Sequence, residues 1–163
     1  DVFVVHGRHL ISRMIRIVTD SHWNHATMYS GKGKYIQADN HGVETKSIED
    51  YGGKDIEIYR HKSITNQQGK KIVHAAMQKI GKKYDFYHLV QLFWYFLFGI
   101  RGNARRIGSK NKYICSELVA DAYVQAGLKV YKNYNPTQIS PADFPESDQF
   151  RLCVQRKNVL MLR

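Results

Sequence analysis

Residues 31–33 read Gly-Lys-Gly and separate two short runs rich in apolar residues, 25–30 and 34–38. Glycine tolerates the backbone angles that tight hairpin turns require, so this pattern predicts a β-hairpin. The two strands of a hairpin are antiparallel, and residues that share a face across them lie close together. We therefore expect an antiparallel sheet.

Segments with helical spacing of apolar residues alternate with further short β-type runs. One face of a predicted helix over 65–80, which Gly81 ends, carries Ile72, Val73, Ala76, Met77 and Ile80. Other helices are expected at 9–19, 47–51, 87–98 and 115–126, and other strands at 3–5, 56–59, 151–155 and 159–162. Residues 99–112 are expected to form a loop. The pattern predicts one α+β domain over residues 1–163, with an antiparallel sheet packed against helices.

The chain is strongly basic, and this bears on its partners. It has 163 residues, an apolar fraction of 43% that supplies a hydrophobic core, and a formal net charge of +11. Such a charge favours anionic partners such as an acidic polymer or a membrane surface, although a basic surface without a dedicated ligand is the other interpretation. The basic residues are dispersed and accompany no nucleic-acid-binding motif, so we predict no specific nucleic-acid partner.

No segment is predicted to span a membrane, because the longest apolar stretch, 89–100, is well short of the roughly 20 residues required. No signal peptide is visible in the chain. The compartment therefore stays open between the cell envelope and the cytoplasm, and the sequence does not indicate an oligomeric state.

Cysteine occurs twice, at positions 115 and 153. One bridge between them is conceivable, but they lie in segments of different character and cannot build a disulfide framework. Cys153 lies in the predicted strand 151–155, where we expect a small, buried hydrophobic residue. Cys115 begins a predicted helix, where backbone N–H groups and the positive end of the helix dipole favour thiolate over thiol. Cys115 is therefore the candidate nucleophile.

His25 is the candidate base. It begins the predicted strand 25–30, at an edge of the sheet where a histidine can meet a helix N-terminus. Gln37 follows on the partner strand, and an even separation across a tight hairpin permits the two side chains to share a face. The amide oxygen of Gln37 can then accept a hydrogen bond from one ring nitrogen of His25 and leave the other facing sulfur, which is the orienting role in a catalytic triad.

Metal binding is not predicted. His22 and His25 have the spacing of some metal ligands, but they lack companion ligands, and no four-ligand zinc pattern is present. We expect no cofactor.

Several blocks in order along the chain resemble a known group of cysteine peptidases. They are Leu10-Ile11-Ser12-Arg13 with Trp23-Asn24-His25-Ala26, Gly33-Lys34-Tyr35-Ile36-Gln37-Ala38, Gly81-Lys82-Lys83-Tyr84-Asp85-Phe86, Tyr113-Ile114-Cys115-Ser116-Glu117-Leu118-Val119, and Ser140-Pro141-Ala142-Asp143-Phe144. Together they resemble the circularly permuted, papain-like branch of the NlpC-type cysteine peptidases, which contains YiiX- and YaeF-like proteins. Lecithin:retinol acyltransferase is a more distant relative. The resemblance implies a circularly permuted papain-like fold in which the histidine precedes the cysteine.

The resemblance also implies a mechanism. Cys115 would attack an amide or ester carbonyl, His25 would hold and return the proton, and water or another acceptor would release the acyl-enzyme. Gln37 occupies the strand that bears the third polar residue. The backbone N–H of Cys115 is expected to bind the oxyanion. Further candidates for oxyanion or substrate binding are Tyr113, His22 and Tyr84.

The leading interpretation is a bacterial or phage-type cysteine hydrolase that cleaves an amide bond in a peptide or peptidoglycan-like substrate. The first alternative is a lipid acyl hydrolase or acyltransferase with the same Cys-His pair, which the aromatic segment 87–98 favours. That segment is apolar nearly all round and so predicts a buried helix, whereas a membrane-facing surface is the other interpretation. A basic nucleic-acid-binding module and a catalytically silent ligand-binding protein are alternatives from other classes.

Overall fold

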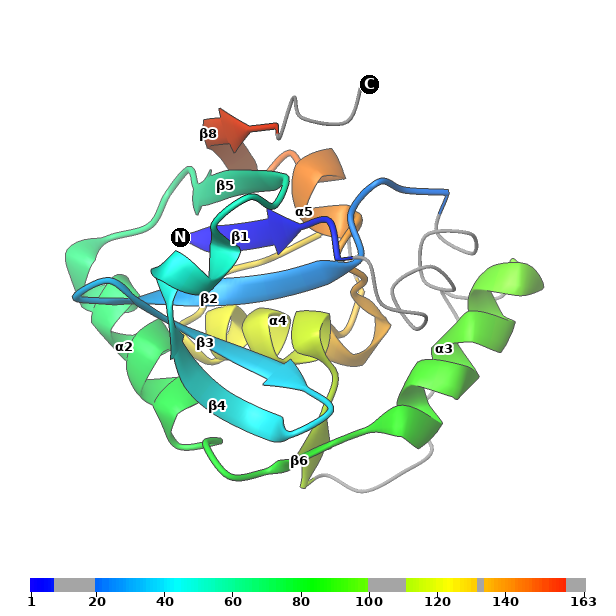
Figure 1. Ribbon diagram of the computed structural model, residues 1–163. Coiled ribbons are helices and arrows are strands. Elements are labelled where there is room, and N and C mark those ends of the chain that lie inside the picture. Colours follow the sequence, from blue (N-terminus) through cyan, green and yellow to red (C-terminus); the bar gives the residue numbers. More distant parts are fainter. Residues whose placement is uncertain (8–19, 100–110, 132–133, 158–163) are drawn as a thin grey trace.

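The computed structural model describes residues 1–7, 20–99, 111–131 and 134–157 (Figure 1). The predicted helix 9–19, the predicted strand 159–162 and most of the predicted loop 99–112 lie outside the described residues. The single domain expected over 1–163 stays a prediction.

Six of the described strands form one sheet, in the spatial order β4-β3-β2-β1-β5-β8. Each neighbouring pair is antiparallel, as predicted. The strands are β1 (Val2–Val5), β2 (His25–Gly31), β3 (Lys34–Asp39), β4 (Gly42–Ser47), β5 (Ile56–His61) and β8 (Phe150–Arg156). Strand β4 was not predicted, and it extends the sheet beyond the β2–β3 hairpin.

The β2–β3 hairpin has the turn that its glycines predict. Gly31, Lys32 and Gly33 all have positive φ angles, of 96°, 53° and 68°. Beyond the turn, Tyr29 pairs with Tyr35 and Met28 pairs with Ile36. Because side chains alternate along a strand, this register puts the even-numbered residues of both strands on one face and the odd-numbered ones on the other.

Helices and a second, small sheet complete the described fold. The longer helices are α2 (Asn66–Met77), α3 (Phe86–Leu97) and α4 (Cys115–Gln125). The short ones are η1 (Ile48–Tyr51), η3 (Pro136–Gln138) and α5 (Asp143–Glu146), and β6 (Lys83–Tyr84) pairs in parallel with β7 (Lys112–Tyr113). Thr65 and Gln68 form a capping box that begins α2.

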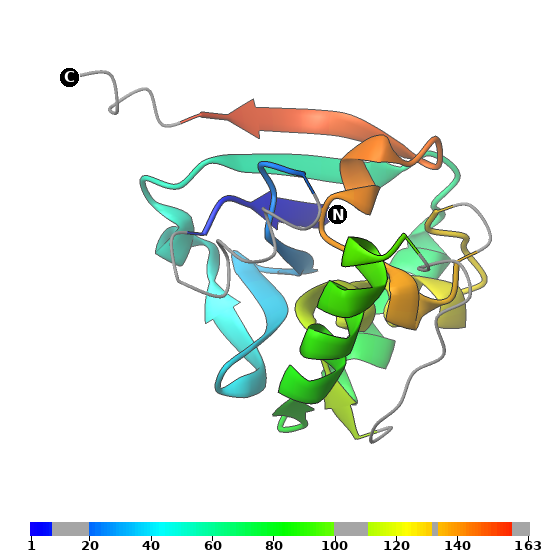
Figure 2. The same ribbon diagram turned by 90° about the vertical axis from the view of Figure 1, so that its right-hand side faces the viewer.

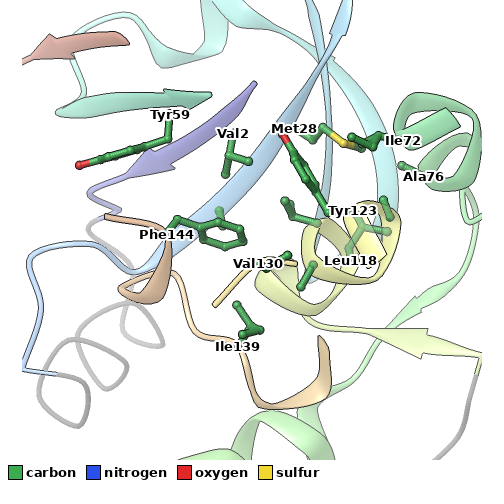
Figure 3. Packing of buried hydrophobic residues seen from close by; sticks show 14 of the residues in the cluster. Val2, Met28, Tyr59, Ile72, Ala76, Leu118, Tyr123, Val130, Ile139 and Phe144 are labelled. Carbon is green, nitrogen blue, oxygen red and sulfur yellow. The ribbon is translucent and has the colours of Figure 1, made fainter. Parts of the chain in front are cut away.

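The main core lies between the sheet and helices α2 and α4 (Figure 3). Helix α4 packs against β2, β3 and α2. Val2 and Met28 from the strands, Ile72 from α2, and Leu118 and Tyr123 from α4 meet in this cluster. Burial of these side chains fixes α4 across the sheet, and it thereby determines where the first residue of α4 lies.

The predicted helix 65–80 ends earlier than expected, at Met77, and both Met77 and Ile80 are about half exposed. Two burial predictions were wrong. Much of α3 is exposed instead of buried, as described below. Cys153 is exposed as well, since β8 is an edge strand on which every residue after Phe150 is exposed.

Candidate active site

Cys115 is the first residue of α4 and is almost fully buried. The amide of Leu118 donates to the carbonyl of Ile114 at 3.0 Å and closes the first turn of the helix. The hydroxyl of Ser116 donates to the carbonyl of Ile139 at 2.6 Å, which ties this turn to the segment after η3. The start of α4 is therefore held in place on two sides.

The sulfur of Cys115 lies against His25 and two backbone N–H groups, those of Ala26 and Ser116. Burial by itself raises the pKa of the thiol. The hydrogen bond and positive charge of His25, together with the two N–H donors, outweigh burial and lower the pKa of Cys115 below its ordinary value. A thiol in this environment is activated for nucleophilic attack.

His25 begins β2, where it pairs with Val5 of β1. Its Nε2 lies 3.0 Å from Oε1 of Gln37. Since an amide oxygen can only accept, Nε2 must carry the proton in the neutral ring, and Nδ1 is left to accept the proton of Cys115. The predicted contact between His25 and Gln37 is confirmed.

Two carboxylates determine the orientation of the Gln37 amide. Its Nε2 donates to Oδ2 of Asp39 at 2.6 Å and to Oε1 of Glu44 at 3.3 Å. Lys46 in turn donates to both carboxylates, at 3.1 Å to Asp39 and at 2.6 Å to Glu44. The amide oxygen must consequently face His25, because carboxylates cannot donate to it. We refer to Asp39, Glu44 and Lys46 as the supporting cluster.

The surroundings of His25 favour its protonated form. Burial lowers the pKa of His25, but its hydrogen bond with Cys115 and the thiolate charge raise it. The hydrogen bond to Gln37 and the negative charge of Asp39 raise it further. The net result is a pKa of His25 above its ordinary value, which supports a thiolate–imidazolium pair with Cys115.

The carboxylate of Glu117, in the first turn of α4, is directed at the backbone that precedes Cys115. It is almost fully buried, and its Oε2 accepts from the backbone N–H of Ile114 at 3.5 Å. The carboxylate thus turns back to the start of the helix.

The other predicted site residues have different surroundings. Tyr84 of β6 pairs with Tyr113 of β7, two residues before Cys115, and burial followed by the charge of Cys115 raises the pKa of Tyr84. The ring of Tyr113 lies under the ammonium of Lys79, at 5.2 Å. Roles for Tyr84, for Tyr113 and for the backbone N–H of Cys115 in binding substrate or an oxyanion stay predictions.

His22 belongs to a separate group of side chains. It is exposed, its ring stacks on His6 at 4.1 Å between centroids, and its Nε2 lies 3.2 Å from Oδ2 of Asp55. An oxyanion role for His22 also stays a prediction.

The contacts of the supporting cluster (Asp39, Glu44 and Lys46) were not predicted from the sequence. Asp39 is two residues beyond Gln37 on the same strand face, and this could have been read from alternation alone. Glu44 pairs directly with Gln37 across β3 and β4. That contact required β4, whose polar residues carry no clear strand pattern.

The histidine lies on the sheet and comes early in the chain, and it faces the cysteine that begins helix α4. This arrangement defines a permuted papain-like cysteine hydrolase. The chain belongs to the family of permuted papain-like amidases described as YaeF/YiiX, C92 family, which it matches over residues 2–153. The predicted fold class and enzyme class are thereby confirmed.

A solved structure supports the fold. The chain is similar to a crystal structure described as metalloprotein yiiX from Escherichia coli O157:H7, with 17% identity, a TM-score of 0.72 and coverage of 95% of both chains. No curated protein matches the chain. Across the ranges that the structure describes, no group of three or more histidine, cysteine, aspartate or glutamate side chains is placed to hold a metal ion.

Proposed function

We propose that this protein cleaves an amide bond in a peptide or peptidoglycan-like substrate through an acyl-enzyme on Cys115. The observation that carries the proposal is the continuous contact from Cys115 to His25 and from His25 to Gln37. A nucleophile, a base in the required tautomer and an orienting group are the components that cysteine acyl transfer needs.

In the proposed reaction, His25 moves the protons while Cys115 forms and breaks the bond to the acyl group. The Cys115 thiolate attacks the carbonyl carbon, and the proton taken from sulfur is held on Nδ1 of His25. That proton passes to the leaving amine as the C–N bond breaks, which leaves a thioester on Cys115. Water then gives a proton to His25 and attacks the thioester, which releases the acid and restores the thiol. Gln37 keeps the imidazole oriented throughout.

Mass spectrometry tests this proposal directly. Incubation with peptidoglycan stem peptides should add the mass of an acyl group to Cys115 and release an amine. The Cys115→Ala variant should form no adduct and show no turnover while its unfolding curve stays unchanged. Cys153→Ala is the matched control, since Cys153 is exposed on β8, and it should retain full activity. Turnover by Cys115→Ala would remove the nucleophile from the mechanism.

A second candidate is a lipid acyl hydrolase or acyltransferase with the same three residues. The observation that favours it is the contact between Tyr84, which pairs with Tyr113 two residues before Cys115, and Phe86 of α3, whose ring centroids lie 4.8 Å apart. Phe86 is exposed and apolar, so an apolar surface begins next to the site. Incubation with phospholipid instead of stem peptides should give a fatty-acyl adduct on Cys115 if this candidate is correct.

A further inference from the structure

Helix α3 presents apolar side chains to solvent. Tyr87, Val90, Trp94 and Leu97 recur at helical spacing and are each at least half exposed. Phe86 and Phe98 flank this row and are also exposed, and the rings of Trp94 and Phe98 stack at 5.7 Å. We refer to these six residues as the outer stripe of α3. Water-facing apolar stripes of this kind mark surfaces that another partner covers.

The inner side of α3 is partly polar. His88 is almost fully buried, its Nε2 lies 2.8 Å from the carbonyl oxygen of Thr137, and its backbone N–H donates to Asp85. Leu92, one turn further, is buried as well. A helix that directs hydrogen-bonding groups at the protein and a row of apolar groups at solvent is the reverse of an ordinary surface helix.

The helix lies beside the candidate active site. Figures 1 and 2 place α3 at the periphery, apart from the six-stranded sheet. Its start is fixed where the backbone N–H of Asp85 donates to the carbonyl of Tyr113 at 3.1 Å, two residues before Cys115. Tyr84 pairs with Tyr113 across β6 and β7, and its ring contacts Phe86 of the outer stripe. A surface on which the outer stripe docks would therefore lie next to Cys115.

Charge indicates what covers the outer stripe. Beside the start of α3, β6 contributes Lys83, β7 contributes Lys112, and Lys82 immediately precedes β6. Helix α3 itself carries no acidic or basic residue except His88. The whole chain has a net charge of +11. Two copies of so basic a chain repel each other, whereas an anionic surface attracts both.

We propose that α3 is an interfacial helix that docks its outer stripe on an anionic lipid bilayer. With 12 residues it extends about 18 Å, and it would lie in the plane of the interface. Trp94 and Tyr87 are residue types that favour the boundary between headgroups and acyl chains. None of the described helices has the length and apolar content that a membrane span requires.

Vesicle co-sedimentation of the full chain tests the proposal. The protein should bind vesicles of phosphatidylcholine with phosphatidylglycerol in low salt, and bind weakly to phosphatidylcholine alone. The Val90→Gln/Leu97→Gln variant should lower the partition coefficient about tenfold or more. The matched control is Leu152→Gln/Val154→Gln, because these side chains on β8 are about as exposed, and it should bind as the wild type does.

Two further readouts separate the contributions of apolar contact and charge. The fluorescence of Trp94 should shift to the blue on binding, whereas Trp23 is already buried. Lys82→Glu/Lys83→Glu should weaken binding, and added salt should reduce the difference from wild type. Circular dichroism and thermal unfolding establish that each variant is folded.

Several results would overturn the docking proposal. One is that the protein does not bind anionic vesicles in low salt, or binds neutral vesicles equally well. Another is that Val90→Gln/Leu97→Gln binds anionic vesicles as well as the wild type does. A third is that the wild type is a dimer and Val90→Gln/Leu97→Gln is a monomer. Cys115→Ala should bind vesicles as the wild type does. The docking proposal therefore stands or fails separately from the proposed hydrolysis.

Discussion

The side-chain amide nitrogen of Gln37 donates to a carboxylate oxygen of Asp39 at 2.6 Å. This contact, with the weaker one to Glu44, leaves the amide oxygen facing His25. A carboxylate at position 37 would stand next to two others, and the amide avoids this repulsion. Glutamine is thus the residue that fits both the histidine and the supporting cluster.

Replacement of Gln37 by glutamate is expected to reduce turnover at neutral pH, since three carboxylates would then share one site. One of them should have a raised pKa and take up a proton as the pH falls. The protonated carboxyl group can donate a hydrogen bond as the amide does, so the activity of Gln37→Glu relative to wild type should increase as pH decreases. Gln37→Ala serves as the control and should show no such recovery. A ratio of Gln37→Glu to wild type that does not vary with pH would contradict this interpretation.

Asp39 is expected to act as a positioning residue with an electrostatic effect on His25. Its negative charge contributes to the raised pKa of His25. Removal of the charge in Asp39→Asn should lower that pKa, and the alkaline limb of the kcat profile should move to lower pH. We expect kcat to fall several-fold with little change in KM. An alkaline limb at the wild-type position would show that Asp39 has only a structural role.

Gly42 is expected to be indispensable for stability. Its φ angle is 104°, and a Cβ atom there would collide with the carbonyl oxygen of Lys82. That oxygen accepts from the backbone N–H of Val43 at 2.8 Å, so it cannot easily move away. Gly42→Ala should lower the free energy of unfolding by about 2 kcal/mol or more.

Urea denaturation measures the effect of Gly42→Ala. Gly69→Ala provides the control, because Gly69 lies within α2 and nothing is near the added methyl group. That change should raise the free energy of unfolding by about 0.5–1 kcal/mol. Equal effects of the two substitutions would contradict the role assigned to Gly42.

Tyr123→Phe is expected to stabilise the protein. The ring of Tyr123 is fully buried in the core, and its hydroxyl has no hydrogen-bond partner among the described residues. A buried polar group without a partner costs about 1–3 kcal/mol, which the phenylalanine would not incur. Thermal unfolding should therefore show a higher midpoint for the variant, and a lower one would indicate that the hydroxyl has a partner in solution.

The sequence was sufficient to predict the central part of this fold. Alternation and the glycine-flanked turn predicted the β2–β3 hairpin, and helical spacing predicted α2 and α4. Together with the resemblance to a known family, these elements predicted Cys115, His25 and Gln37 as the candidate site. These sequence patterns involve residues close together in the chain, within one helix or one hairpin. The structures they predict therefore depend least on the rest of the chain.

Burial was harder to predict, because it depends on what covers each element. The apolar composition of α3 and of β8 is the same whether a neighbouring element covers them or not, and so Trp94 and Cys153 were expected inside. The supporting cluster was missed for a related reason. Glu44 and Lys46 contribute through cross-strand pairing, which polar residues do not reveal in the sequence.

The pH dependence of Cys115 alkylation by iodoacetamide, followed by mass spectrometry, tests the central claim most directly. Because the pKa of Cys115 is lowered, its alkylation should remain fast below pH 8.5, the approximate pKa of a free thiol, and should slow only as the pH falls through the lowered pKa. In His25→Ala the imidazolium is absent, so fast alkylation should require a higher pH. If wild type and His25→Ala both titrate as ordinary thiols do, the thiolate–imidazolium pair and the mechanism built on it are contradicted.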